Sequence, residues 1–205
     1  EKGNSLTLRI PPTFDGYVRA FTNYALEHEG KKLGMGGATH EYAKIWGAMI
    51  KKEWESKGGE VVSDNPMDYN KSADFFTGVS RIISESPDVM FVGGASEPTG
   101  LVVQQARQMG FQGGFIVMDK AEYDKMPGSE AAYNYLALHA LVEAMDATES
   151  TDPKTIRAAI GDALRNMDTR KNPYEVTEVT ENGGFVTETT LAVVKDGEIV
   201  REEIK

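Results

Sequence analysis

The stretch Gly93–Thr99, GGASEPT, joins an apolar run to a helix-like pattern and places a serine just after the turn. A nucleophilic serine on such a turn needs the spacing G-x-S-x-G, because the glycines let the serine sit on a strained, exposed bend. Here Pro98 stands where the second glycine is required. A catalytic triad also needs a histidine, and the chain has three: His28, His40 and His139. The spacing argues against a hydrolase site at Ser96, and we expect no enzymatic activity.

A second glycine-rich segment, GMGGAT at Gly34–Thr39, lies between a predicted strand and a predicted helix. The dinucleotide-binding pattern G-x-G-x-x-G would require a glycine where the chain has Thr39. The phosphate-binding pattern G-x-x-x-x-G-K-[ST] does not occur in the sequence. We interpret these glycines as permitting a tight turn and close helix packing, with nucleotide binding through Gly34–Thr39 as the alternative.

Acidic residues are common, but none has the spacing of a metal site such as D-x-D-x-D-G or H-E-x-x-H. Asp64, Asn65 and Asp68 surround a proline, where such side chains more often form turns than bind calcium. We therefore expect no metal and no cofactor.

Composition excludes several further classes of function. The chain has 22 Lys and Arg against 32 Asp and Glu, a formal net charge of −10 that argues against nucleic-acid and anionic-lipid partners. The absence of cysteine excludes disulfides, thiolate metal sites and cysteine nucleophiles. No run approaches the roughly 18 apolar residues of a membrane span, and no signal peptide is visible in this chain.

Strand-like and helix-like segments alternate regularly through the first part of the chain. Near-continuous apolar strands are typical of a parallel sheet covered on both faces, and strand–helix–strand units in series imply right-handed crossovers. The pattern predicts a flavodoxin-like, doubly wound α/β fold, preceded by a helix capped by Asp15. The predicted strands are residues 31–38, 59–64, 88–94 and 113–119, and the predicted helices are residues 40–57, 71–86 and 97–109.

The regular alternation of strand-like and helix-like segments stops near residues 123–128. We therefore divide the chain into a βα array, residues 1–125, and a C-terminal part, residues 126–205. The second part is predicted to hold two helices, over residues 129–147 and 150–164, and a β-hairpin that turns at Asp196-Gly197. We expect this part to pack on the array. The first of its helices should turn one set of large apolar residues toward a core: Tyr135, Leu138, Leu141, Val142 and Met145.

Polar residues follow each predicted strand at its carboxyl end, the edge where open parallel sheets bind solutes. Helix N-terminal amides suit an anionic group and a carboxylate suits an ammonium, so this edge fits a small zwitterion. Helix capping alone would also explain Ser96 and Asp119. The candidate ligand-binding residues are Thr39, His40, Tyr42, Ala95, Ser96, Glu97 and Asp119, and Glu41, Asp64, Asn65 and Lys120 lie on the same edge.

Residues 68–119, DYNKSADFFTGVSRIISESPDVMFVGGASEPTGLVVQQARQMGFQGGFIVMD, closely resemble the second lobe of the type I periplasmic solute-binding proteins. This is the leucine/isoleucine/valine-binding and extracellular ligand-binding receptor family of ABC importers. PPTFDGYVRAFTNYALEHEGKKLGMGGATHEYAKIWGAMIKKEWESKGGEVV resembles the segment just before that stretch, where the family's chain crosses from the first lobe. GSEAAYNYLALHALVEAM and GGFVTETTLAVVKDGEIV resemble the family's C-terminal portion. The family's first lobe has no counterpart here, so the chain resembles a truncated or minimised member.

The resemblance implies a periplasmic or extracellular protein whose two lobes close around an amino acid or similar solute and then dock on a membrane permease. By position, Tyr42 would cover the ligand, Ala95 and Ser96 would line the pocket, and Asp119 would pair with the ligand ammonium. Without a first lobe, affinity should be weak. The surfaces that such a lobe covers, including parts of the helix at residues 130–147, would then be exposed and invite homodimerisation. The alternatives are a nucleotide-binding or enzymatic domain, or a dimerising lobe fragment that binds no ligand.

Overall fold

The computed structural model describes residues 6, 14–71, 74–94, 97–118, 129–172, 174, 176, 178–180, 183–186, 190–195 and 198–203. The chain divides into two compact units. We call Phe14–Asp124 the sheet unit, and Glu1–Thr13 together with Lys125–Lys205 the helical unit. The predicted boundary near residues 123–128 lies outside the described residues. That the C-terminal part packs on the array stays a prediction.

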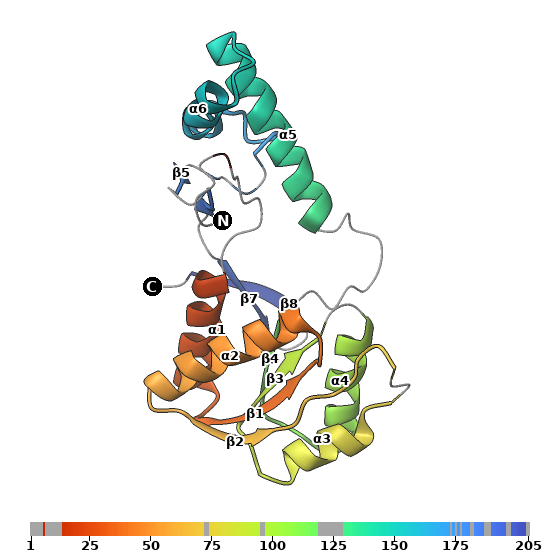
Figure 1. Cartoon of the computed structure of the whole chain (residues 1–205). Helices are drawn as coiled ribbons and strands as arrows, with labels where there is room; N and C mark the ends of the chain where they lie inside the picture. Colours follow the sequence, from red (N-terminus) through yellow and green to blue (C-terminus); the bar gives the residue numbers. More distant parts are fainter. Residues whose placement is uncertain are drawn as a thin grey trace. The chain divides into compact units, whose positions relative to one another are not determined.

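The sheet unit is built on four parallel strands in the order β2-β1-β3-β4 (Figure 1). Their bounds are Lys32–Gly37 for β1, Glu60–Asp64 for β2, Val89–Gly93 for β3 and Gly114–Val117 for β4. Every residue of the central strand β3 is buried, as expected for a strand with neighbours on both edges and helices on both faces.

Four helices cover this sheet, α1 and α2 on one face and α3 and α4 on the other (Figure 1). Their bounds are Phe14–His28 for α1, Glu41–Ser56 for α2, Phe76–Ile83 for α3 and Glu97–Gln108 for α4. This arrangement and strand order confirm the predicted doubly wound, flavodoxin-like α/β fold.

Glycines in β1 allow α3 to lie close to the sheet. A β-carbon added to Gly34 would collide with the side chain of Ile82, and one added to Gly36 would lie 3.1 Å from its Cδ1. On the opposite face, Trp46, Ile50 and Trp54 of α2 are buried in the core. The close packing predicted for these glycines is confirmed, but Gly34 and Gly36 are strand residues rather than turn residues.

Two element ends differ from the sequence prediction. Helix α3 begins at Phe76 rather than at residue 71. The reason is that the Phe75 amide donates to Oε1 of Gln105 at 2.7 Å instead of to a carbonyl of a preceding helical turn. Asp15, predicted as the cap of the first helix, lies inside the first turn of α1. A carboxylate there is still favourable, because it faces the positive end of the helix dipole.

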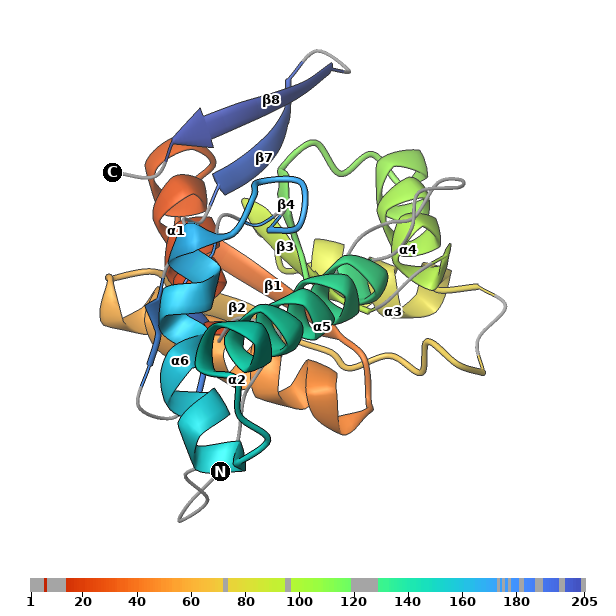
Figure 2. The ribbon, with the colours of Figure 1, turned by 90° about the horizontal axis from the view of Figure 1, so that it is seen from above.

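The helical unit pairs α5 (Ser129–Thr148) with α6 (Pro153–Asn166), which pack against each other (Figure 2). Helix α6 begins as its sequence predicts, with Pro153 in the first turn and the Asp152 carboxylate accepting from the Thr155 amide at 2.8 Å. The buried core of this unit consists of Leu136, Ala140, Ala144, Ile156, Ile160, Leu164, Met167, Val176 and Phe185.

Two antiparallel strand pairs complete this unit. Strand β5 (Glu178–Val179) pairs with β6 (Phe185–Val186), and β7 (Thr190–Lys195) pairs with β8 (Glu198–Glu203). The register places Lys195 opposite Glu198, so two residues connect β7 to β8, which confirms the predicted hairpin. The turn residues Asp196 and Gly197 lie outside the described residues.

The predicted core face of α5 is wrong except at Met145, which is partly buried against the core of the helical unit. Large side chains expected to be buried are exposed: Tyr135 by 47%, Leu138 by 60%, Leu141 by 42% and Val142 by 43%. The core instead uses Leu136, Ala140 and Ala144, which are fully buried. Small alanine side chains let α6 approach α5 closely, and this contact selects which face of α5 is buried.

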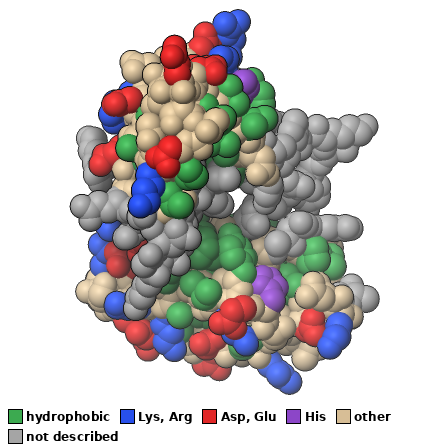
Figure 3. Space-filling view, turned by 45° about the horizontal axis from the view of Figure 1, so that its top comes forward, with side chains coloured by type: hydrophobic (Ala, Val, Ile, Leu, Met, Phe, Trp, Pro, Cys, Tyr) green, Lys and Arg blue, Asp and Glu red, His purple; other side chains and the backbone are tan. Residues whose placement is uncertain are grey.

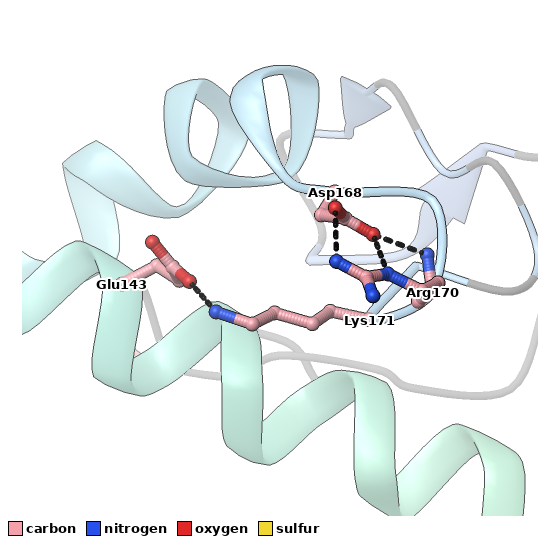
Figure 4. Close-up of polar contacts among 4 residues, drawn as sticks. All are labelled: Glu143, Asp168, Arg170 and Lys171. Atoms are coloured by element: carbon pink, nitrogen blue, oxygen red, sulfur yellow. Dashed lines mark hydrogen bonds and ion pairs between the residues drawn. The ribbon is translucent and has the colours of Figure 1, made fainter.

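A loop that follows α6 is fastened to α5 by charged side chains (Figure 4). Nζ of Lys171 lies 2.6 Å from Oε1 of Glu143, and the Arg170 guanidinium donates to both oxygens of Asp168 at 3.0 Å. These hydrogen bonds from Arg170 lower the pKa of the Asp168 carboxyl to about 2. The buried Asn172 orders the same loop, donating to the Val176 carbonyl at 2.8 Å and accepting from its amide at 2.9 Å.

Candidate functional site

The carboxyl ends of β1, β3 and β4 meet at one edge of the sheet. Gly37 pairs with Gly93, and Val92 pairs with Val117, so the three strands end nearly level. From β1 the chain passes to β2 on one side and then crosses back to β3 on the other. This reversal places the topological switch point between β1 and β3, where open α/β sheets leave a crevice for ligands.

The turn from β1 into α2 lies at this switch point. The Ala38 amide donates to the Gly93 carbonyl at 2.8 Å, which ties the turn to the end of β3. Thr39 follows and is exposed. His40 is the N-cap of α2, and its Nδ1 accepts from the Ala43 amide at 3.2 Å. A histidine ring here fills the role that Ser, Thr, Asn and Asp more often take.

Tyr42 stands at the rim of this turn and is 42% exposed. Its ring lies over the His40 ring, with centroids 6.3 Å apart, and meets the Phe14 ring edge-on at 5.3 Å. Phe14 in turn packs on Trp46, with centroids 5.0 Å apart. These aromatic contacts between α1 and α2 pack against one side of the exposed Tyr42 ring, which limits the rotamers that this side chain can adopt.

Tyr69 occupies the space between the ends of β1 and β3. Its hydroxyl donates to the Gly36 carbonyl at 2.7 Å, and a β-carbon added to Gly94 would collide with its ring. Burial raises the pKa of the Tyr69 hydroxyl, so the hydroxyl stays a donor. Our sequence reasoning missed Tyr69, because it lies in a loop without periodicity. Gly94, whose missing side chain leaves room for the Tyr69 ring, is the signal that could have indicated a large side chain there.

Thr99 lies beside Tyr69 in the first turn of α4. It is fully buried, and its Oγ1 would lie 2.8 Å from a β-carbon at Gly94. Among the residues that the structure describes, this hydroxyl has no hydrogen-bond partner. Burying a hydroxyl without a hydrogen bond costs free energy of folding. Thr99 is thus a second polar residue near the switch point, after Tyr69, and it is not among the candidate ligand-binding residues that the sequence indicates.

The residues after β2 have structural roles. Asp64 pairs with Lys51, with Oδ2 and Nζ 3.7 Å apart, and Nδ2 of Asn65 donates to the Gly78 carbonyl at 3.3 Å. Oδ1 of Asp68 accepts from the Asn70 amide at 3.1 Å, the turn role that was predicted. Among the described residues there is no group of three or more His, Asp or Glu side chains that could hold a metal ion.

The structure brings together three of the predicted ligand-binding residues, Thr39, His40 and Tyr42, on one turn at the carboxyl edge. Ala95, Ser96 and Asp119 lie outside the described residues. Glu97 is the first residue of α4, and its side chain is not described.

The alternative of a phosphate loop at Gly34–Thr39 does not fit the geometry, because the glycines from Gly34 to Gly37 belong to strand β1.

In the part of the chain that the structure describes, no helix is both long and apolar enough to cross a membrane.

Comparison with known proteins identifies the family. The model of the periplasmic binding protein family matches residues 1–124. A comparison with curated proteins found no match. Among solved structures, a leucine-binding protein of Thermotoga maritima shares 19% identity, with a TM-score of 0.75 over 98% of this chain and 68% of that one.

Two further structures have the same fold. A branched-chain amino acid ABC transporter periplasmic ligand-binding protein of Burkholderia xenovorans is 16% identical, with a TM-score of 0.73 over 94% of this chain and 64% of its own. A periplasmic binding protein of Burkholderia mallei is 14% identical, with a TM-score of 0.69 over 88% of this chain and 57% of its own. The chain thus spans between 57% and 68% of the length of these three structures. With the family model matched over more than half of its residues, this chain belongs to the periplasmic binding protein family.

Proposed function

We propose that this chain binds a small polar solute, an amino acid or a related compound, at the carboxyl edge of its sheet. The observation that carries the proposal is the turn after β1, where Thr39, His40 and Tyr42 lie together at the switch point between β1 and β3. The role is binding and release, and the solute leaves chemically unchanged.

The chemistry of this edge suits a zwitterion. The N-terminus of α2 offers backbone amides and the positive end of a helix dipole to a carboxylate, and Tyr42 offers an aromatic face. Asp119 follows β4, the neighbour of β3, and we assign it to the ligand ammonium. Ala95, Ser96 and Glu97, which follow β3, complete the proposed wall. Affinity should be weak if this lobe acts alone, because ligand pockets normally bury most of the ligand surface.

The proposed setting is an ABC uptake system, in the periplasm or at the cell surface. Supporting this are the similar structures of a leucine-binding protein and of a branched-chain amino acid ABC transporter ligand-binding protein. In that setting the partner is a membrane permease.

The proposal is tested by calorimetric titration and thermal shift of the chain with a panel of amino acids and, separately, of nucleotides. A solute that binds the folded state raises the melting temperature. We expect leucine, isoleucine or valine, or another amino acid, to do so. Stabilisation by a nucleotide and by no amino acid would contradict the proposal.

Two matched pairs of variants place the site. Tyr42→Ala should weaken binding by about tenfold, the equivalent of roughly 1.4 kcal/mol. Ile45→Ala, one turn along the same helix and 45% exposed against 42% for Tyr42, should leave binding unchanged. Asp119→Ala should abolish the amino-acid-induced shift with the fold intact, while Asp146→Ala on α5 should preserve it. Equal effects within a pair would remove that residue from the site.

A further inference from the structure

We propose that two residues, Gly37 and Tyr69, limit the size of the solute that the carboxyl edge of the sheet accepts. Tyr69 fills the side of the switch point that faces α3 and α4, and Gly37 leaves room on the side that faces α2. We call these the filled side and the open side. The inference rests on the proposed function and adds a size limit to it: the accepted solute carries a short aliphatic side chain rather than an aromatic one.

The strand ends on both sides of the switch point carry no side chains. Strand β1 ends in Gly36 and Gly37, and β3 ends in Gly93, with Gly94 directly after it. Glycine is common where a backbone must come close to another group, such as a ligand. The space next to these four residues is therefore filled by side chains of other elements or is left for the solute.

On the filled side, the side chain comes from the loop after β2. A β-carbon added to Gly94 would collide with the Tyr69 ring. This ring packs on Phe75, just before α3, with centroids 5.0 Å apart, and the hydroxyl donates to the Gly36 carbonyl at 2.7 Å. Tyr69 is held at both ends of its side chain and is only 5% exposed. It is therefore a fixed wall of the proposed site.

On the open side, the sheet faces α2. A β-carbon added to Gly47 of α2 would lie 3.5 Å from Cε of Met35 and 3.8 Å from Cε1 of Phe91. Gly37 lies two residues after Met35 and so faces the same side of the sheet. A β-carbon there would lie 3.8 Å from the same Phe91 atom, and no other described atom beyond its chain neighbours lies within 4 Å. Unlike Gly94, Gly37 thus has room for a methyl group.

The open side also offers apolar surface to a solute. Helix α2 begins there with His40 and Tyr42, whose ring centroids lie 6.3 Å apart, and Tyr42 is 42% exposed. Figure 3 shows hydrophobic side chains beside a histidine on the sheet unit, in the lower half of the view. A short aliphatic side chain of the solute would fit over Gly37, whereas an aromatic one would need the volume that the Tyr69 ring occupies.

Calorimetric titration with valine and phenylalanine tests the wall. The readout is the ratio of the two dissociation constants in each protein, because a general loosening of the fold weakens both and leaves their ratio unchanged. The parent should bind valine about tenfold more tightly than phenylalanine. Tyr69→Ala should reduce this preference about tenfold by opening the filled side, while Tyr69→Phe, which keeps the ring, should preserve it. Tyr69→Leu replaces Tyr69→Ala if the alanine variant does not fold.

Phe111→Ala is the matched control for the wall. Phe111 is also 5% exposed, but it precedes β4 and so lies at the amino edge of the sheet. The variant removes a ring of similar size and should leave the ratio of the two dissociation constants unchanged.

Gly37→Ala tests the open side in a variant that should fold, because its methyl group makes only an ordinary contact. The methyl group takes the place of the solute's side chain, so the affinity for valine should fall about tenfold while that for free glycine changes little. Gly47→Ala, whose methyl group would contact the same Phe91 atom from α2, is the control and should change neither affinity.

Valine binding with ratios that respond to neither Tyr69 nor Gly37 would overturn the size limit and leave the proposed function standing. Equal binding of valine and phenylalanine by the parent would do the same. A ratio that responds to only one of the two residues would remove the other from the proposal. If no amino acid binds the parent or any variant, the proposed function fails and the size limit fails with it.

Discussion

The hydroxyl of Tyr69 donates a 2.7 Å hydrogen bond to the carbonyl oxygen of Gly36, a residue 33 positions earlier in the chain. This bond joins the loop after β2 to the end of β1, next to the turn that holds Thr39 and His40. The ring of Tyr69 packs over Gly94 at the end of β3, so one side chain connects both strands that flank the switch point.

Tyr69→Phe should therefore destabilise the sheet unit by about 1 kcal/mol, the typical net value of a buried hydrogen bond. Urea denaturation followed by circular dichroism measures the difference. Tyr17→Phe, which removes the hydroxyl of a half-buried tyrosine in α1, serves as the control and should change stability less. If both variants unfold at the same urea concentration as the parent, the Tyr69 bond makes no net contribution.

The two tryptophans offer a comparison within one helix. Nε1 of Trp54 donates to the Lys31 carbonyl at 3.0 Å, whereas the buried Nε1 of Trp46 has no hydrogen-bond partner in the described part of the chain. Both side chains are almost fully buried, so replacement by Phe removes similar packing. We expect Trp54→Phe to cost about 1 kcal/mol more than Trp46→Phe in free energy of unfolding, because only Trp54 loses a hydrogen bond. The reverse order in urea denaturation would contradict this assignment.

Gly34→Ala should destabilise the chain by about 1–3 kcal/mol, because the added methyl group overpacks the contact between β1 and Ile82. Gly161→Ala provides the contrast. Its added β-carbon would lie 3.7 Å from Nη1 of Arg165, an ordinary contact, so α6 should gain about 0.5–1 kcal/mol from the lower backbone entropy. Melting temperatures of the two variants should move in opposite directions. A neutral Gly34→Ala would mean that α3 does not pack closely on β1.

The Asp168 carboxyl should titrate near pH 2 rather than at its ordinary pKa of 3.8, because Arg170 donates hydrogen bonds to it. Since the pKa is lowered in the folded state, its contribution to stability is fully present above pH 3.8 and is lost as the pH falls through about 2. Carbon-13 NMR of the carboxyl groups follows this titration. Arg170→Ala should return the midpoint toward 3.8, and Lys171→Ala should raise it less. A parent midpoint near 4 would refute the assignment.

Local sequence pattern predicts the sheet unit well, because each of its elements carries its own signal. A buried apolar run marks β3, and helical spacing marks α2 and α4. Pattern fails where a distant contact decides the outcome. The start of α3 is set by the bond from Phe75 to Gln105, 30 residues away, which no local periodicity reveals.

The face of α5 illustrates a second limit. Periodicity identifies the helix but ranks the larger side chains as the buried ones. In the structure α6 requires a close approach, which the alanines at 140 and 144 allow. At the candidate site, residue types after each strand predict the turn with Thr39, His40 and Tyr42. They do not indicate Tyr69 or Thr99, whose positions depend on how the loop and α4 fold back over the ends of β1 and β3.

The histidine that begins α2 has its ring orientation and tautomer fixed by one contact. Because Nδ1 accepts from the Ala43 amide, the proton of the neutral imidazole resides on Nε2. Any molecule that reaches this ring from outside thus meets a hydrogen-bond donor and no acceptor. That polarity selects for carboxylate, carbonyl or hydroxyl oxygens, and leaves the recognition of positively charged groups to other side chains.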